Sequence, residues 1–461
     1  MAASSAPTEL GTEKIGKLLK QYALPAIIAQ TASSLYNMVD SIFIGHGVGS
    51  LAISGLAVTF PLMNLSTAFG TLVGLGGATI MSVLLGQHNY KAADKVLGNV
   101  LTLNTIISIL FMAVALIFID PILYFFGASE NTLPYAKEYM KIILYGNAIT
   151  HLYFGLNNLM RSAGNPKKAM GLTIFTVLFN TALDPLFIFV FDMGISGAAW
   201  ATVISQTLAL VVVMHHFSRK TRIPHFEKGY FRLDRRIAKD SLSIGFGPFL
   251  MNSAACLVTL FINQQLRKYS GDLGIGSYGI CNRLTFMFVM ICIGFNQGMQ
   301  PIAGYNYGAR KYSRVKEVFK KTAIMATVVT TICCLLSVFA PRIAASVFTS
   351  DPELLDMASE SLRIMNLMFF LVGFQMISTN LFQCLGMVNK SILLSLSRQI
   401  LILLPLLYLL PLEFGGKGIW MSFPISDFLA FVMTAVLLGR LFRKLGKLND
   451  GDDPTILGSK L

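Results

Sequence analysis

The sequence predicts an all-α polytopic membrane protein with twelve transmembrane helices in two parallel six-helix repeats. The prediction comes from the composition, from the recurrence of long apolar stretches and from a similarity between the two halves of the chain. Of the 461 residues, 54% are hydrophobic and only 13% are charged, and the mean hydropathy is +0.63. Soluble domains carry about 25% charged residues. A chain of this composition is therefore expected to lie mostly within a lipid bilayer.

Each expected helix is a continuous apolar stretch that is long enough to cross a hydrocarbon core of ~30 Å. Short polar loops separate the stretches, and apolar residues do not alternate with polar ones as they would in the strands of a transmembrane barrel. In chain order we expect spans at about 20–45, 51–84, 96–119, 138–160, 169–191, 197–217, 241–265, 275–304, 322–348, 360–386, 391–411 and 417–439.

The basic residues indicate how the spans are oriented. The formal net charge is +14, and Lys and Arg gather in alternate loops, most densely in RKTRIPHFEKGYFRLDRRIAK at 219–239. By the positive-inside rule, these loops and both termini face the cytoplasm. We therefore expect a multi-pass protein of the cytoplasmic (inner) membrane. A nucleic-acid partner is not expected, because the charges sit in short loops without a soluble module to present them.

The two halves of the chain repeat one another. GQHNYKAADKV, which begins at Gly86, resembles GARKYSRVKEV, which begins at Gly308, 222 residues later. Nearly the same spacing relates Asn158 to Asn380, Gly164 to Gly386, Gly194 to Gly415 and Pro25 to Pro248. Because each repeat holds an even number of spans, both enter the membrane from the same side. The expected parts are an N-terminal segment 1–19, an N-lobe 20–217, a basic cytoplasmic linker 218–240, a C-lobe 241–440 and a cytoplasmic tail 441–461.

Two carboxylates within the expected spans are the main functional candidates, because an ionisable side chain at membrane depth costs roughly 2.5–3.5 kcal/mol to insert. Asp40 shares one stripe of the first span with other polar residues at spacings of three and four, namely Gln30, Ser33, Ser34, Asn37 and Ser41. Asp184 follows Asn180 by one turn, and the adjacent Pro185 is expected to kink the helix. Thr202 and Gln206 share a face of the sixth span. These polar faces are expected to converge on one cavity.

Several roles stay open at this point. The second half has Asn263 and Leu406 where the first has Asp40 and Asp184, so the acids either exchange a cation or proton or staple helices together. His151, which shares the fourth span with Asn147 and Asn158, is either a hydrogen-bonded interior histidine or a proton relay. Asp427 either pairs with Arg398 or Arg363 or lines the second lobe.

No enzymatic chemistry is expected. The sequence contains neither a His-Glu-x-x-His metal motif nor a Gly-x-x-x-x-Gly-Lys phosphate loop, so we expect no cofactor and no ATP site. Two similar bundles that move against each other are a common basis of transport by alternating access. An ion gradient is then the energy source, since moving one charge through 100 mV is worth about 2.3 kcal/mol.

The ordered motifs resemble the multidrug and toxic compound extrusion (MATE) family over residues 20–440. They are SLYNMVDSIFIGHGVGSLAISGLAVTFPL, GQHNYKAADKV, NNLMRSAGNPKKAM and NTALDPLFIF with GISGAAWATVISQ, together with their echoes in the second half. Within the family, the chain is most similar to prokaryotic multidrug-export members whose essential acids lie in the N-lobe. The resemblance implies a V-shaped antiporter that acts as a monomer and expels small organic, often cationic, drugs or toxins in exchange for H⁺ or Na⁺.

The resemblance also implies roles for individual residues. Asp40 matches the acid of the first helix, and Asn180, Asp184 and Thr202 match the polar set that holds the proton or Na⁺. Residues implied or expected to line the substrate cavity are Tyr36, Asn37, Gln30, Ser33, Gln206, His151, Asn158 and Asn263. The branch named for norfloxacin export carries acids in helices seven and ten. The corresponding segments of this chain lack them, so a C-lobe cation site of that kind is not expected.

A flippase for lipid-linked saccharides is the alternative, because the wider superfamily includes such proteins on similar scaffolds. Those carriers bind anionic pyrophosphate, which favours arginines in the cavity. The first span of this chain has an acid and no arginine, which favours export of cations.

Overall fold

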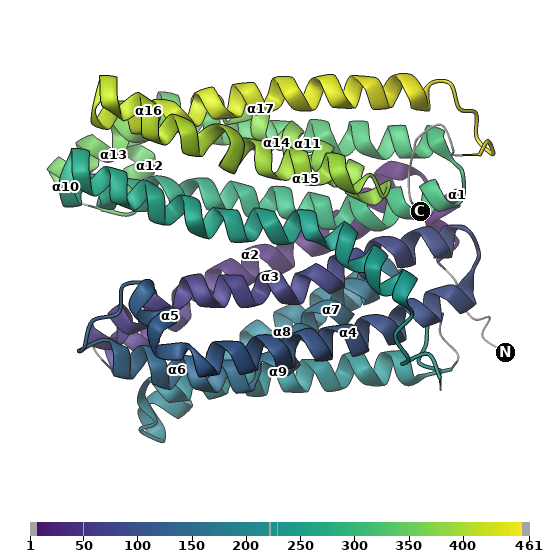
Figure 1. Ribbon diagram of the computed structural model, residues 1–461, viewed down its shortest axis with the longest axis horizontal. Helices are drawn as coiled ribbons and strands as arrows, with labels where there is room; N and C mark the ends of the chain where they lie inside the picture. The colour runs from purple at the N-terminus through teal and green to yellow at the C-terminus, as the bar shows by residue number, and fades with distance from the viewer. Residues whose placement is uncertain (1–6, 49, 221–222, 228, 350, 454–461) are drawn as a thin grey trace. The chain divides into compact units, whose positions relative to one another are not determined.

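The computed structural model describes residues 7–48, 50–220, 223–227, 229–349 and 351–453, and this part of the chain is helical with no strand (Figure 1). The helices of the first half are α1 (Glu9–Thr12), α2 (Ile15–Gly47), α3 (Ser50–Gly86), α4 (Tyr90–Ile117), α5 (Ile119–Phe125), α6 (Leu133–Tyr145), α7 (Asn147–Ser162), α8 (Pro166–Pro185), the π-helical η1 (Leu186–Val190) and α9 (Gly194–Ser218). Those of the second half are α10 (Arg235–Gly308), α11 (Tyr312–Phe339), α12 (Pro341–Ser346), α13 (Pro352–Met365), α14 (Phe370–Cys384), α15 (Val388–Leu396), the π-helical η2 (Ser397–Leu403), α16 (Leu404–Phe414) and α17 (Gly416–Leu445).

The helices correspond to the predicted spans. Among the described residues, nine helices are long and apolar enough to cross a membrane, and α13 with α14, bent by 54°, form a tenth. The long helix α10 counts as two of these, because Gly271 breaks it with a φ of 63°. The helix α2 and the pair α6 and α7, which meet at Gly146, supply the remaining predicted spans. The predicted all-α membrane fold is thus confirmed.

The sequence repeat is also present in the backbone. Among the described residues with a positive φ, three pairs are 222 or 221 residues apart: His88 and Arg310 (59° and 55°), Gly164 and Gly386 (89° and 67°), and Gly194 and Gly415 (58° and 57°). A positive φ is uncommon for a residue other than glycine. Its recurrence at matched positions shows that the two halves share not only their helices but also the turns between them.

The chain divides into two compact units. The first holds residues up to 12 and 28–249, and the second holds 13–27 and 250–461. The boundaries differ from those of the predicted lobes 20–217 and 241–440, because residues 20–27 pack with the second unit and 241–249 with the first. Each unit therefore contains the opening segment of a long helix whose remainder belongs to the other unit.

Glycines make this exchange of helix segments possible. In the first unit, a Cβ on Gly245 of α10 would lie 1.7 Å from the backbone oxygen of Leu72 of α3, and one on Gly76 would lie 1.9 Å from the backbone oxygen of Ser241. The two helices thus approach backbone to backbone. In the second unit, a Cβ on Gly298 of α10 would lie 2.4 Å from Cα of Ala23 of α2. Small residues at such crossings are typical of helix packing in membranes.

Replacing Gly245 with alanine is expected to destabilise the protein by about 1–3 kcal/mol, the usual cost of overpacking. The sign of the change in unfolding free energy distinguishes a crowded position from an open one. At an open helical position, alanine stabilises a helix by up to ~1 kcal/mol relative to glycine. At Gly279 of the same helix, a Cβ would have no neighbouring atom within 4 Å, so Gly279→Ala serves as the control. Thermal unfolding of the purified variants in detergent measures the change in stability caused by each substitution. Equal melting temperatures for the two variants would contradict the packing described.

The segment after α17 caps α11. Asp450 accepts hydrogen bonds from the backbone N–H of Ser313 at 2.9 Å and from its hydroxyl at 2.5 Å. The Tyr312 hydroxyl donates to the backbone oxygen of Asp452 at 2.8 Å. The first N–H groups of a helix have no partner within the helix. In most helices the N-cap residue accepts a hydrogen bond from one of these N–H groups. In α11 this acceptor is the side chain of Asp450, which is distant in the sequence.

The cap is expected to weaken in acid. Burial acts to raise the pKa of Asp450, but the hydrogen bonds from Ser313 outweigh it and hold that pKa below its usual value of 3.8. A carboxylate with a lowered pKa contributes fully above its usual pKa and loses its contribution as the pH falls through the lowered value. The protection of the amides of residues 446–453 against hydrogen exchange, relative to the intrinsic exchange rate at each pH, should thus be constant above about pH 5, and lower in Asp450→Asn at neutral pH. Equal exchange in wild type and variant would show that the cap is unimportant.

Candidate functional site

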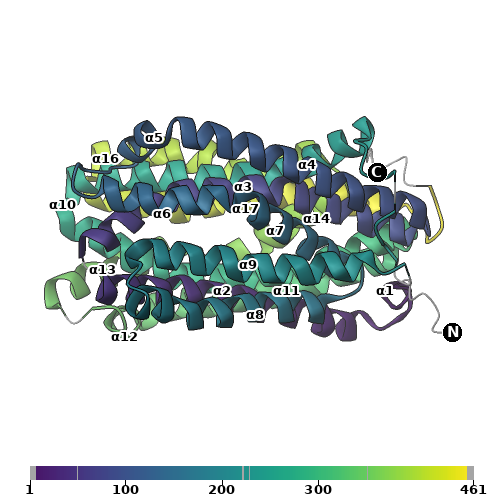
Figure 2. The same ribbon diagram turned by 90° about the horizontal axis from the view of Figure 1, so that it is seen from below.

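Asn180, Asp184 and Thr202 form one hydrogen-bonded cluster between α8 and α9, which pack side by side in the first unit (Figure 2). In the amide orientation that satisfies both ends of its side chain, Asn180 donates to Asp184 Oδ2 at 2.9 Å. Its oxygen then accepts from the hydroxyl of Thr202 at 3.0 Å and from its backbone N–H at 2.9 Å. Asp184 is fully buried and Asn180 is 2% exposed. The amide therefore positions the carboxylate.

Asp40 of α2 is the second acid of this unit. It is 5% exposed, and its Oδ1 has no hydrogen-bond partner among the described residues. Asp40 and Asp184 both belong to the first unit, and both are buried. A buried carboxylate oxygen without a partner is costly. A bound proton or monovalent cation would satisfy it.

The backbone changes conformation immediately beside the cluster. Pro185 is the last residue of α8, and the chain continues as the π-helical segment η1. Proline cannot donate the backbone hydrogen bond that an α-helix requires. The structure shows a π-helical turn at this position, a feature often found at functional sites, and the predicted kink itself stays a prediction.

The other residues expected in the cavity are dispersed, and most of them belong to the first unit. Gln206, one turn beyond Thr202 on α9, accepts a hydrogen bond from Thr150 of α7 at 2.5 Å. Ser33 donates to the backbone oxygen of Ala29, and both it and Gln30 are half-buried. The side chains of Tyr36 and Asn37 lie outside the described residues.

His151 is fully buried between α3, α4 and α7. Its Nε2 lies 3.2 Å from the Ser66 hydroxyl, which donates to Asn147 at 2.5 Å. The backbone oxygen of His151 accepts a hydrogen bond from the side chain of Asn104. The ring also lies 6.3 Å from that of Phe111. Its Nδ1 is buried without a hydrogen-bond partner among the described residues, so both alternatives left by the sequence, an interior histidine and a proton relay, stay predictions.

Two asparagines expected in the cavity have different surroundings. Asn158 accepts a hydrogen bond from the buried Arg161 at 3.3 Å. Asn263 is half-buried on α10 and belongs to the second unit, whereas Asp40 and Asp184 belong to the first. A role for either residue in binding a substrate stays a prediction.

A polar network next to the cluster was not predicted. Thr173 of α8 accepts from Asn157 at 3.2 Å and lies 3.4 Å from the Tyr153 hydroxyl, and Thr176 donates to the same hydroxyl at 3.4 Å. Thr176 precedes Asn180 by one turn. The threonines lie on the same stripe of α8 as Asn180 and Asp184, with spacings of three and four residues, and this pattern was available in the sequence.

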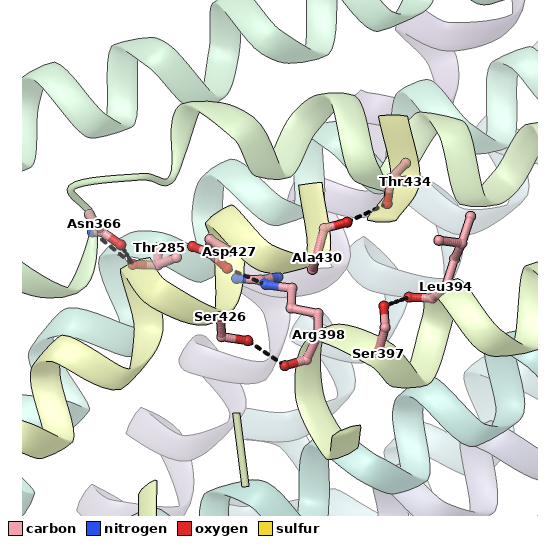
Figure 3. A network of polar contacts seen from close by, with 9 residues as sticks. All are labelled: Thr285, Asn366, Leu394, Ser397, Arg398, Ser426, Asp427, Ala430 and Thr434. Carbon is pink, nitrogen blue, oxygen red and sulfur yellow. Dashed lines mark hydrogen bonds and ion pairs between the residues drawn. The ribbon is translucent and has the colours of Figure 1, made fainter. Parts of the chain in front are cut away.

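Asp427 and Arg398 form a buried ion pair in the second unit. Arg398 Nε of η2 lies 2.6 Å from Asp427 Oδ1 of α17, and the neighbouring Ser426 donates to the backbone oxygen of Arg398 at 2.6 Å (Figure 3). Asp427 is 2% exposed. Of the alternatives that the sequence left open, pairing with Arg398 is observed. Asp427 is thus paired with a cation within its own unit.

Comparison with known proteins gives the same family over most of the chain. The profile of the MatE family matches residues 25–186 and 244–409. The multidrug export protein MepA of Staphylococcus haemolyticus (strain JCSC1435) is 28% identical over 431 residues, which cover 93% of this chain and 95% of the relative. MepA of Staphylococcus aureus (strain MSSA476) is 28% identical over 428 residues, with 93% and 94% covered.

Solved structures agree with this result. The MATE multidrug transporter DinF-BH has a TM-score of 0.88 and is 36% identical, with 95% of this chain and 98% of that chain covered. An outward-facing multidrug resistance MATE family transporter of the MOP superfamily shares the fold, with a TM-score of 0.88 at 22% identity and 96% and 99% covered. These matches and the apolar helices establish a multi-pass membrane protein, and the chain belongs to the MatE family of transporters.

Proposed function

We propose that this protein exports small organic, often cationic, compounds across the cytoplasmic membrane in exchange for H⁺ or Na⁺. The observation that carries the proposal is that two carboxylates of the first unit are buried: Asp184 is held in the Asn180 and Thr202 cluster, and Asp40 Oδ1 has no hydrogen-bond partner among the described residues. The names of the relatives, multidrug export protein and multidrug transporter, support the substrate class.

The proposed cycle uses these groups in order. In the outward state, Asp40 and Asp184 take up H⁺ or Na⁺, which removes negative charge from the N-lobe. Binding of a cationic drug is weakened because its counter-charge is lost. The first helix then rearranges near Pro25, which interrupts the backbone hydrogen bonds of α2. Return to the inward state releases the coupling ion to the cytoplasm and restores the anionic site for the next drug.

Efflux of ethidium from proteoliposomes tests the proposal. A pH gradient and a Na⁺ gradient are imposed separately on vesicles that contain wild type or Asp40→Asn. We expect one gradient to drive uphill efflux by wild type, and the rate to fall at least tenfold in the variant, because an amide cannot exchange a proton and carries no charge to hold Na⁺.

The outcome also identifies the coupling ion, since only the gradient of that ion drives efflux. If neither gradient drives ethidium efflux, antiport of organic cations is contradicted and the lipid-linked saccharide flippase becomes the function to test, with translocation of a labelled lipid-linked saccharide as the assay.

A further inference from the structure

Described residues of the segment between the two halves of the chain, among them His225 and Asp234, are hydrogen-bonded to the beginning of α4. Asp94 Oδ1 accepts from the backbone N–H of His225 at 2.8 Å, and Asn99 Oδ1 accepts from that of Asp234 at 2.7 Å. Further along α4, Thr102 donates to the backbone oxygen of Phe231 at 2.8 Å. A Cβ on Gly98 would lie 2.4 Å from the backbone oxygen of Tyr230, so the segment runs in direct contact with the helix.

Three side chains at this contact present a set of metal ligands. Asp94 of α4, His225 and Glu227 each place one ligand atom so that all three lie within 4.8 Å of one another. The Asp94 side chain is 7% exposed, that of His225 is 22% exposed, and Glu227 is exposed. His225 Nδ1 is buried without a hydrogen-bond partner among the described residues, 3.7 Å from Asp94 Oδ1.

No hydrogen bond among the described residues accounts for that nitrogen. At 3.7 Å, Nδ1 is too far from Asp94 Oδ1 for a hydrogen bond. Buried polar atoms are almost always satisfied, and each exception calls for an explanation such as a bound ion. The neighbouring cation Lys95 is turned toward Tyr230, with its ammonium 5.7 Å from the centre of the ring.

We propose that Asp94, His225 and Glu227 bind a divalent transition-metal ion, with Zn²⁺ as the representative. One imidazole and two carboxylates form a mixed nitrogen and oxygen donor set that suits such ions, with water completing the coordination. Zinc holds these ligands at about 2.0–2.2 Å. The exposed Glu227 side chain can rotate inward and close the set. The bound ion ties the linker to α4 and is separate from the acids proposed for transport.

Zinc titration of the purified full-length protein, with any histidine tag removed and metal stripped by chelator, tests the site. We expect wild type to bind one equivalent, with Zn²⁺ raising its melting temperature and slowing protease cleavage in 219–234. His225→Ala and Glu227→Gln should each weaken binding at least tenfold. Neither variant removes the backbone N–H that donates to Asp94, so both should fold. Uphill efflux without added metal should be unchanged.

His215→Ala is the matched control. His215 lies at the end of α9, where its ring contacts Arg219 at 3.1 Å at the surface, so the control removes a histidine that is not part of the site. It should bind Zn²⁺ as wild type does. Binding that is equally strong in wild type, His225→Ala and Glu227→Gln, or no binding by wild type, would overturn the proposal and leave Asp94 as a hydrogen-bonding anchor of the linker.

Discussion

Asp184→Asn is expected to abolish gradient-driven efflux, with a loss of at least tenfold in the initial rate of ethidium transport into or out of proteoliposomes, while the protein still folds. The substitution keeps the shape of the side chain, and its oxygen can still accept from Asn180. It removes the carboxylate, the group that exchanges a proton or compensates the positive charge of Na⁺ in the cluster. Because the neighbouring Asp40 carboxylate remains, the variant isolates the contribution of Asp184 to coupling.

Asp192→Asn provides the control for that measurement. Asp192 lies just beyond η1, is exposed and has a φ of 52°, a conformation that asparagine also adopts readily. The change in charge is the same, but the position is outside the buried cluster. We expect wild-type rates. Normal, ion-dependent efflux by Asp184→Asn would disprove its coupling role and leave it a structural acid.

Arg398→Ala is expected to cause the largest loss of stability among the variants considered. It leaves the carboxylate of Asp427, 2% exposed, without its partner. Breaking a buried ion pair from one side costs about 3–5 kcal/mol. The side chain of Arg398 is 26% exposed, so a value near the lower end is expected. Thermal unfolding in detergent and the yield of monodisperse protein measure the effect.

The double variant Arg398→Met with Asp427→Leu separates loss of a partner from loss of packing. Replacing both partners of a buried pair by apolar residues is often neutral, so it should recover most of the stability that Arg398→Ala loses. Lys417→Ala is the exposed control, since Lys417 and Glu360 pair at 2.9 Å with side chains 71% and 57% exposed. Such a pair is worth about 0–1 kcal/mol. Equal stability of Arg398→Ala and Lys417→Ala would contradict the importance of the buried pair.

The sequence was sufficient to predict the fold class. Hydropathy identified the helices because a bilayer requires about 20 apolar residues in each span. The repeat was detectable because glycines and turn residues recur where the backbone needs a positive φ, as at Gly164 and Gly386. The cluster could be anticipated on α8, since Asn180 and Asp184 are one turn apart and polar residues in an apolar helix must share a face.

Contacts between helices far apart in the sequence depended on the tertiary structure. The exchange of helix segments between the units arises where Gly245 and Gly298 allow backbones to meet, and helical periodicity does not specify which helix fills such a gap. Pairing of Asp427 with Arg398 rather than Arg363 was likewise decided by the rotation of α17 and η2. Hydropathy and periodicity thus predicted the helices, their repeat and the polar groups expected at membrane depth. Which of those groups have a neighbour of opposite charge could be read from the packed helices alone, because it depends on distances of a few ångströms between separate helices.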